Sequence, residues 1–358
     1  MWQGCSLPAL LRLLWRNGLA VYPGYAYMPF VMATAGLIHL LGQALENVRY
    51  GDRPKRTTIR HPPVFIIGHW RTGTTLLHEF LSLDPQFSSP STYACLCPHH
   101  FLISEPFADQ LFWWMLPSRR PMDNMKTGWN RPQEDEFALC MLGQPSPYLT
   151  IAFPNHPPQD QQAFTLEQLP TRAREEWKRT FVTFLRRLTF RDPRRLVLKS
   201  PTHTWRIPLL LELFPKARFL HIVRNPYQVY LSTLKLWTAL YQTHGLQRPT
   251  GQGLEENVLA RLADCYARLE ATRSLVPPGH LYELRYEDLI ARPIEEMRAV
   301  YERLELGDFE AVRPRLEAYW AEQQGYQTNP YPALSNEQRQ RITQACRSVL
   351  QRYGYGEA

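Results

Sequence analysis

Several hallmarks of common protein classes are missing from this chain. Its six cysteines are scattered, and the sequence has no C-x-x-C pair, no His/Cys ligand spacing, no internal repeat and no low-complexity segment. A chain of 358 residues with this cysteine pattern is expected to be reduced and cytoplasmic, and not a disulfide scaffold or a zinc protein. A recognisable nucleic-acid-binding motif is missing as well, so nucleic acid is not an expected partner.

The bulk composition is that of a globular protein. Hydrophobic residues make up 44% of the chain and charged residues 21%, which is enough to build a sizeable core. The net charge is +8, and much of the excess is arginine, whose planar guanidinium matches phosphate and sulfate oxygens. Solvated basic surface explains the same charge equally well, so net charge alone does not identify a ligand.

The first 50 residues are predicted to form a helical leader. Their start carries few charges and no small-residue cleavage site, which argues against a secretory signal. Tyr25 to Leu45 is apolar, but His39, Gln43 and the early Pro29 make it a weak membrane span. We expect the leader to pack on the protein or on a partner subunit, or to contact a membrane surface peripherally.

Residues 51–358 are predicted to form one α/β domain, in which short apolar runs alternate with helical segments. This rhythm indicates a parallel sheet flanked by helices in three layers. The expected strands are Val64–Gly68, Leu196–Lys199, Arg218–Val223 and Leu281–Leu284. The expected helices begin near Thr74 and cover Thr171–Leu188, Trp205–Phe214 and Leu254–Leu275. A segment rich in Pro, Trp, His and Tyr, at about residues 88–160, is predicted to be an insertion that shapes an acceptor site.

The most informative stretch is a glycine-containing turn between the first strand and the first helix of this domain. Gly68 and Gly73 are five residues apart, and two threonines open the helix. Such a turn presents backbone N–H groups and the positive end of a helix dipole to an anion. The candidate anion-binding residues here are Arg71, Thr72, Gly73, Thr74, Thr75 and Leu76.

This turn differs from the P-loop of nucleotide triphosphatases, G-x-x-x-x-G-K-[ST], at one informative position. Thr74 stands where the P-loop has lysine, and the positive charge has moved back to Arg71. Without that lysine the turn is poorly built to hold β- and γ-phosphates with Mg²⁺, but it suits a single phosphosulfate group.

A second anion site is predicted at the end of the strand Arg218–Val223. Arg224 follows this strand, the turn Asn225-Pro226 comes next, and Ser232 lies eight residues after the arginine. An arginine at the carboxyl end of a strand can make a two-pronged contact with phosphate oxygens.

Together these motifs resemble the PAPS-dependent sulfotransferases, where PAPS is 3′-phosphoadenosine-5′-phosphosulfate. Members carry a Lys or Arg before an (S/T)-G-T-T turn, and an arginine at a strand end with a serine eight residues later. Lys199-Ser200-Pro201-Thr202-His203, Glu134-Asp135-Glu136 and Tyr286-Glu287-Asp288-Leu289 resemble further segments, of which the K-S-P-x-H and E-D-E motifs are typical of the bacterial-type branch. The resemblance covers about Pro63 to Asp288 and the tail segment Asn329-Pro330-Tyr331. It implies a P-loop-like fold, PAPS as co-substrate and transfer of a sulfuryl group to an acceptor hydroxyl.

Sulfuryl transfer is an in-line displacement in which positioning and cationic stabilisation do most of the work. Lys199 ends a predicted strand where a Walker-type site would have an Asp for Mg²⁺, so we expect no metal. Lys199 and Arg71 are predicted to flank the transferring group. In relatives a lysine in this K-(S/D)-P turn lies near the bridging oxygen or the sulfuryl group.

A general base must take the proton of the acceptor hydroxyl. The candidates are His99, His100, Glu105 and the run Glu134–Glu136, with His100 preferred and Glu136 second. None stands at the spacing usual in the family, because Thr92 occupies roughly the place where some relatives have Glu. The aromatic residues Trp70, Trp113, Trp114, Trp129 and Tyr148 could line an acceptor pocket, but packing is the better default.

Two other functions remain open at this point. A P-loop kinase or nucleotide triphosphatase using ATP with Mg²⁺ would share the turn, but it requires a lysine at position 74 and a strand-end Asp. A non-catalytic module that binds anions or lipid would explain the charge and the leader. The acceptor is equally open among small-molecule, glycan, lipid and peptide hydroxyls.

Overall fold

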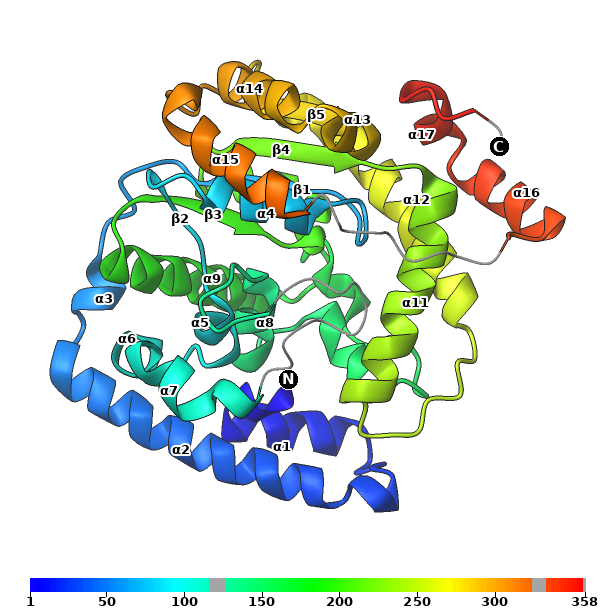
Figure 1. Cartoon of the computed structure of the whole chain (residues 1–358). Coiled ribbons are helices and arrows are strands. Elements are labelled where there is room, and N and C mark those ends of the chain that lie inside the picture. The colour runs from blue at the N-terminus through cyan, green and yellow to red at the C-terminus, as the bar shows by residue number, and fades with distance from the viewer. Residues whose placement is uncertain (116–126, 324–332, 357–358) are drawn as a thin grey trace. The chain divides into compact units, whose positions relative to one another are not determined.

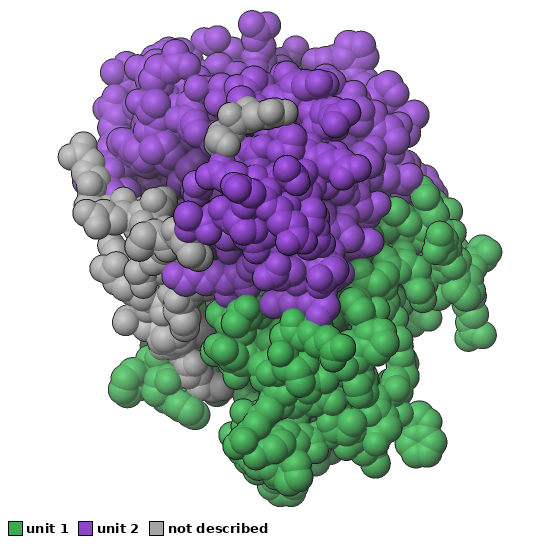
Figure 2. Space-filling view, turned by 90° about the vertical axis from the view of Figure 1, so that its right-hand side faces the viewer, with its two compact units in different colours: residues 1–61, 88–194, 237–252 green, residues 62–87, 195–236, 253–358 purple. Residues whose placement is uncertain are grey.

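The computed structural model describes residues 1–115, 127–323 and 333–356, which form two compact units (Figure 2). Unit 1 consists of residues 1–61, 88–194 and 237–252, and unit 2 consists of residues 62–87, 195–236 and 253–358. The leader, residues 1–50, thus belongs to the same unit as residues 88–194. The division at residue 50 and the insertion at 88–160 stay predictions.

Unit 2 contains a parallel sheet and the helices that cover it (Figure 1). Its elements are β1 (Val64–Ile67), α4 (Thr74–Ser82), β3 (Arg195–Lys199), η7 (Pro201–Trp205), α10 (Ile207–Leu213), β4 (Arg218–Val223), α12 (Leu254–Thr272), η8 (Arg273–Leu275), β5 (Leu281–Arg285), α13 (Tyr286–Ala291), α14 (Pro293–Leu304), α15 (Phe309–Gln323), α16 (Asn336–Ala345) and α17 (Arg347–Arg352). Two elements, β2 (Phe87–Ser88) and α11 (Pro226–His244), lie where the chain passes from one unit to the other.

The sheet has the strand order β2-β3-β1-β4-β5, and β1 pairs in parallel with both β3 and β4. Phe65 lies opposite Leu198 on one side and Phe219 on the other. The carboxyl ends of β1, β3 and β4 therefore lie at one edge of the sheet. The predicted α/β fold with a parallel sheet is confirmed, and all four predicted strands are present within one residue at each end.

Alternate side chains of each strand face opposite sides of the sheet, and both faces are covered. Val64 and Ile66 join a buried apolar cluster with residues of α4, α14 and α15. On the other face, the Phe65 ring packs against His203 of η7 and stacks on Phe219, with ring centroids 5.2 and 5.6 Å apart. Burial on both faces explains why these strands are continuous apolar runs.

Three predicted helices differ from the structure at their ends. The helix expected at Thr171–Leu188 continues to Arg191. The expected helix Trp205–Phe214 is divided into η7 and α10, because Arg206 has a non-helical backbone between them and Pro208 opens the first turn of α10. The expected helix Leu254–Leu275 ends at Thr272 and continues as the 3₁₀ turn η8. The tail segment Asn329–Tyr331 lies outside the described residues.

Unit 1 is helical in its described part. Its elements are η1 (Trp2–Gly4), α1 (Leu7–Arg16), η2 (Pro23–Tyr25), α2 (Tyr27–Tyr50), α3 (Arg53–Arg56), α5 (Thr92–Leu96), α6 (Phe101–Ser104), η3 (Glu105–Phe107), α7 (Ala108–Phe112), η4 (Trp113–Met115), α8 (Asp135–Met141), η5 (Pro147–Ile151), η6 (Gln161–Ala163) and α9 (Thr171–Arg191).

Buried polar groups fasten α2 to the rest of unit 1. His39 bonds through Nδ1 to His100 Nε2 at 2.8 Å and through Nε2 to the Gln3 carbonyl at 2.7 Å. Gly42 permits this approach, since a Cβ there would meet the His100 ring at 2.6 Å. One turn later, buried Glu46 accepts a hydrogen bond from the Leu102 amide and pairs with Arg187.

Burial lowers the pKa of the three clustered histidines. The pKa of His39 is lowered, that of His99 falls to about 3 and that of His100 to about 4; the neighbouring imidazoles and Arg187 lower the last two further. In an unfolded chain these side chains titrate near 6.5. The unfolded state therefore binds more protons than the folded state as the pH falls below about 6.5.

We predict that stability decreases between pH 6.5 and 4, with His99 and His100 each contributing a loss on the order of 1–2 kcal/mol at pH 5 and His39 a loss of the same sign. Denaturant unfolding at pH 7.5 and 5 measures this loss. His100→Asn should reduce the pH dependence, whereas His61→Asn, at an exposed position of the same unit, should retain it. Equal pH dependence in the two variants would contradict the prediction.

Candidate functional site

The turn between β1 and α4 has a backbone shape that its glycines permit. Gly73 has φ +105°, and a Cβ on Gly73 would lie 2.5 Å from Cδ2 of Tyr286. A Cβ on Gly68 would lie 2.6 Å from the Ile222 carbonyl oxygen. Arg71, between them, has φ +69° although it is not glycine, so this turn holds an unfavourable conformation of the kind found at ligand-binding sites.

Two threonine hydroxyls hold the turn in this shape. Thr204 Oγ1 accepts a hydrogen bond from the Gly68 amide at 2.9 Å and donates to the Gly68 carbonyl at 3.2 Å. Thr72 Oγ1 donates to the His69 carbonyl at 2.7 Å. Thr204 was not among the sequence candidates. The Lys199–His203 motif was the available signal for Thr204, because Thr204 directly follows this motif at the carboxyl end of β3.

Lys199 lies at the carboxyl end of β3, where the sequence predicted a catalytic cation. Its side chain is buried, with 2% exposure, and Nζ lies 3.5 Å from the Thr75 hydroxyl in the first turn of α4. A buried ammonium group and the amino end of a helix are thus brought together. Both favour negative charge.

Arg71 joins the two predicted anion sites. Its Nε donates to the Ser232 hydroxyl at 2.9 Å, and its carbonyl accepts from Nη1 of Arg224 at 3.3 Å. The turn after β1 and the strand end of β4 therefore form one cluster within unit 2. Sequence spacing predicted each half but not this direct contact.

Arg224 is held by an aromatic ring. Its guanidinium carbon lies 4.3 Å from the ring centroid of Tyr286, a cation–π contact. Among the described residues, the partners of Arg224 are this ring and the Arg71 carbonyl, and neither is a carboxylate. Its guanidinium is only partly buried, so donor N–H groups are left to meet an anion.

The segment Tyr286–Leu289 supports the second anion site directly. Glu287 accepts a hydrogen bond from the Asn225 amide at 3.1 Å. The side-chain carbonyl of Asn225 in turn accepts from the Tyr227 amide at 3.0 Å, at the start of α11. These contacts fix the turn that carries Arg224.

The general-base candidates lie in unit 1, in hydrogen-bonded surroundings. His100 precedes α6, and its ring nitrogens contact His39 Nδ1 at 2.8 Å and Ser104 Oγ at 2.7 Å. Glu136 is fully buried in α8 and accepts from the Ser146 hydroxyl at 2.7 Å. Among the aromatic candidates, Trp70, Trp129 and Tyr148 are buried, whereas Trp113 and Trp114 are exposed.

Unit 2 thus presents two neighbouring sets of groups that suit anions. One set comprises the turn after β1, the Thr75 hydroxyl and Lys199, and the other comprises Arg224 and Ser232. Within the residues that the structure describes, no group of three or more His, Cys, Asp or Glu side chains could hold a metal ion.

Comparison with known proteins gives a consistent result. The sequence pattern described as "Sulfotransferase family" matches residues 62–310. The chain is 46% identical over 355 residues to proteins of Mycobacterium bovis and Mycobacterium tuberculosis named omega-hydroxy-beta-dihydromenaquinone-9 sulfotransferase Stf3. The alignment covers 99% of this chain and 91% of each relative.

Solved structures show the same fold at much lower identity. The crystal structure of sulfotransferase STF9 from Mycobacterium avium matches with a TM-score of 0.66 and 19% identity, covering 90% of this chain and 86% of that one. The crystal structure of sulfotransferase STF1 from Mycobacterium tuberculosis matches with a TM-score of 0.63 and 18% identity, covering 94% and 89%.

The contact between Gly73 and Tyr286 predicts a position-specific cost. Gly73→Ala should lower the free energy of unfolding by about 1–2 kcal/mol for the left-handed backbone and by roughly 1–3 kcal/mol more for overpacking against the ring. Gly279→Ala is the matched control, because Gly279 has φ +77° and open space around its missing Cβ. Denaturant unfolding of both variants tests this, and equal losses would show that the ring contact does not matter.

Proposed function

Because the chain belongs to the sulfotransferase family, we propose that it transfers a sulfuryl group from PAPS to the hydroxyl of a lipid-like acceptor. The family and the 46% identity to named sulfotransferases establish that the chain is a transferase enzyme. The kinase and the non-catalytic alternatives are thereby set aside. PAPS as the donor, the acceptor class and the roles of individual residues are the proposal.

The observation that carries the donor assignment is the cluster of cationic and hydroxyl groups at the carboxyl ends of β1, β3 and β4. We propose that residues 71–76 bind the 5′-phosphosulfate, since the Gly73 backbone and the start of α4 present N–H groups there. Arg224 and Ser232 are proposed to bind the 3′-phosphate, which distinguishes PAPS from ATP. When bound, PAPS supplies the sulfuryl group and a bisphosphate leaving group.

Lys199 and Arg71 are proposed to stabilise the charge that develops during transfer. Lys199 is held near the Thr75 hydroxyl and is shielded from water, so its charge acts in surroundings of low dielectric. The Arg71 backbone is locked by the left-handed turn and by the Arg224 contact. Both cations therefore need little rearrangement during the reaction. Metal independence stays part of the proposal.

The acceptor proposal comes from the relatives. Two proteins at 46% identity over nearly the whole chain are named for omega-hydroxy-beta-dihydromenaquinone-9, a hydroxylated and reduced menaquinone. We therefore propose an acceptor of that chemical class, a terminal hydroxyl on a long apolar chain. Such an acceptor resides in a bilayer, so the enzyme is proposed to act in the cytoplasm at a membrane surface.

The general base is proposed to be His100, with Glu136 second. Burial lowers the pKa of His100 to about 4, so its imidazole is neutral at pH 7 and can accept a proton, as a weaker base than an ordinary histidine. To act on a hydroxyl it must exchange its contact with His39 or Ser104 for the acceptor. Glu136 would have to release Ser146 in the same way.

Binding of the product analogue adenosine 3′,5′-bisphosphate tests the donor site. We predict metal-independent binding, measured by titration calorimetry, that is tighter than that of ADP or of ATP with Mg²⁺. Arg224→Ala should weaken it about 10- to 100-fold, because a charge-assisted hydrogen bond is worth about 1.5–3 kcal/mol. Arg292→Ala, at an exposed arginine of unit 2, is the control. Unchanged affinity in Arg224→Ala would contradict the second anion site.

Turnover with PAPS and an omega-hydroxylated menaquinol tests the catalytic roles. Lys199→Ala and Arg71→Ala are expected to lower kcat by roughly 10²–10³-fold, with a smaller change in nucleotide affinity, because they act mainly on the transition state. If His100 is the base, His100→Asn lowers kcat similarly and Glu136→Gln does not. The reverse result would assign the base to Glu136. Full activity in Lys199→Ala would contradict the proposed mechanism.

A further inference from the structure

The solvent-facing side of α2 is apolar along its whole length. Phe30, Leu41 and Val48 are 75%, 68% and 86% exposed. The exposed apolar residues of this helix are Tyr27, Phe30, Val31, Leu37, Ile38, Leu40, Leu41, Leu45 and Val48. Most recur at spacings of three, four or seven residues, so they form one stripe on the helix surface. Isolated exposed apolar residues are ordinary, but a contiguous stripe of this length marks an interaction surface.

The opposite side of α2 is buried and carries two polar groups that fix the helix to the rest of unit 1. His39 and Glu46 lie on it, buried, with the partners described above. By length and composition the segment Pro23–Tyr50 could cross a membrane. To do so, however, α2 would carry His39 and Glu46 into hydrocarbon and leave the Arg187 guanidinium without its carboxylate, which is costly. The buried contacts of His39 and Glu46 therefore favour a helix that lies flat against a bilayer.

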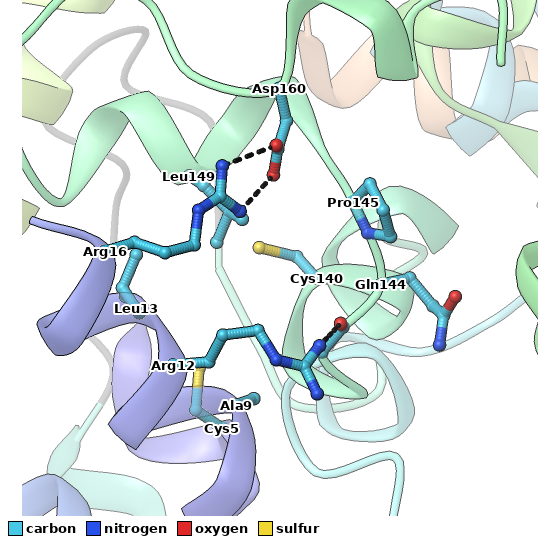
Figure 3. A pocket seen from close by; sticks show the side chains of 11 residues that line it. Cys5, Ala9, Arg12, Leu13, Arg16, Cys140, Gln144, Pro145, Leu149 and Asp160 are labelled. Atoms are coloured by element: carbon cyan, nitrogen blue, oxygen red, sulfur yellow. Dashed lines mark hydrogen bonds and ion pairs between the residues drawn. The ribbon is translucent and has the colours of Figure 1, made fainter. Parts of the chain in front are cut away.

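Helix α1 is held in the same manner, and it packs against α2. Arg12 donates to the Gly143 carbonyl at 3.2 Å, and Arg16 makes two hydrogen bonds with Asp160 at 2.8 and 3.2 Å. Figure 3 shows both guanidinium groups reaching from α1 across a small cavity lined by Cys140. Away from these contacts, Leu11 and Trp15 are 58% and 81% exposed.

A further group of exposed apolar side chains follows α6, which packs against α2. They belong to η3, α7 and η4 and comprise Phe107, Leu111, Trp113 and Trp114. Tryptophan is enriched at membrane–water interfaces, because its ring is apolar and its indole N–H is polar. The exposure of Trp113 and Trp114 is unexpected for packing residues but is typical of interfacial anchors.

Basic residues lie in the last turn of α2 and directly after it. Arg49, Arg53, Lys55, Arg56 and Arg60 are exposed. The same stretch contains one acidic residue, Asp52, which pairs with Lys55 and Arg56. A basic cluster beside an apolar helix is complementary to a bilayer with anionic headgroups. A second copy of this chain would instead bring the same net charge of +8.

We propose that unit 1 docks on an anionic lipid bilayer through the apolar faces of α1 and α2, with α2 parallel to the membrane plane. The exposed side chains of α1, α2 and η3–η4 enter the interfacial region, and the basic residues 49–60 contact the headgroups. This docking surface is argued from unit 1 alone and does not depend on the donor or on the transfer chemistry. It would bring the enzyme to where a lipid-like acceptor resides.

Vesicle co-sedimentation of the full-length chain tests the proposal. The protein should bind phosphatidylcholine vesicles that contain phosphatidylglycerol, and high salt should weaken the binding. The double variant Leu41→Gln/Val48→Gln should bind about tenfold more weakly or worse, because it removes two apolar side chains from the surface. The matched control is Leu275→Gln, at a residue of η8 in unit 2 that is 55% exposed. Arg53→Gln/Arg56→Gln should lose the preference for anionic lipid.

Each other outcome overturns the proposal. One such outcome is failure to bind anionic vesicles at low salt, and a second is equal binding of the double variant and Leu275→Gln. A third is resistance of the bound protein to alkaline carbonate extraction, which would indicate a spanning helix. A stable dimer in solution that the double variant dissociates would show that a second copy covers the face. Affinity for adenosine 3′,5′-bisphosphate reports folding of unit 2, so failed docking and failed nucleotide binding are separate results.

Discussion

The side chain of Thr204 bonds to both backbone polar groups of Gly68, and the turn between β1 and α4 depends on this contact. β1 ends at Ile67, so the chain has to leave the sheet while its backbone groups are still buried. Thr204 forms hydrogen bonds with the amide and the carbonyl of Gly68. Without these bonds, both groups would be buried without a partner, which is unfavourable because they would lose their hydrogen bonds to water. Space at Gly68 and Gly73 completes the requirement, because a side chain at either position would displace β4 or Tyr286.

The electrostatic character of the site follows from how its cations are held. Arg71 contacts the Ser232 hydroxyl, and Arg224 is oriented by a backbone carbonyl and a tyrosine ring. The partners of Arg224 among the described residues fix the direction of its guanidinium group without neutralising it, whereas a carboxylate would do both. The buried Lys199 lies against the first turn of α4, where the helix dipole is positive. Positive potential accumulated in this way favours a ligand with several negative charges over one with a single charge.

The sequence predicted the sheet and the glycine turn after β1 well because both depend on local patterns. Strands buried on both faces are continuous apolar runs, and the glycine spacing of the turn is visible without tertiary information. The motifs place Thr204 and Tyr286 near strand ends, but their contacts with the turn could not be predicted, because these contacts join segments more than a hundred residues apart. The environment of His100 was equally hidden, since its neighbour His39 comes from the leader. Tertiary hydrogen bonds of this kind leave no spacing signal.

The tethering of α2 also has a consequence for synthesis of the chain. His39 and its partner His100 are separated by 61 residues, and Glu46 and Arg187 by 141 residues. At a translation rate of about 5–20 residues per second, Glu46 waits roughly 7–28 s for Arg187 to be made. During that interval neither side of α2 has its final neighbours, and the helix is the most apolar segment yet to leave the ribosome. The nascent chain is therefore exposed to premature capture by chaperones or by the translocation machinery, and the polar residues His39 and Glu46 make the helix a poorer substrate for insertion.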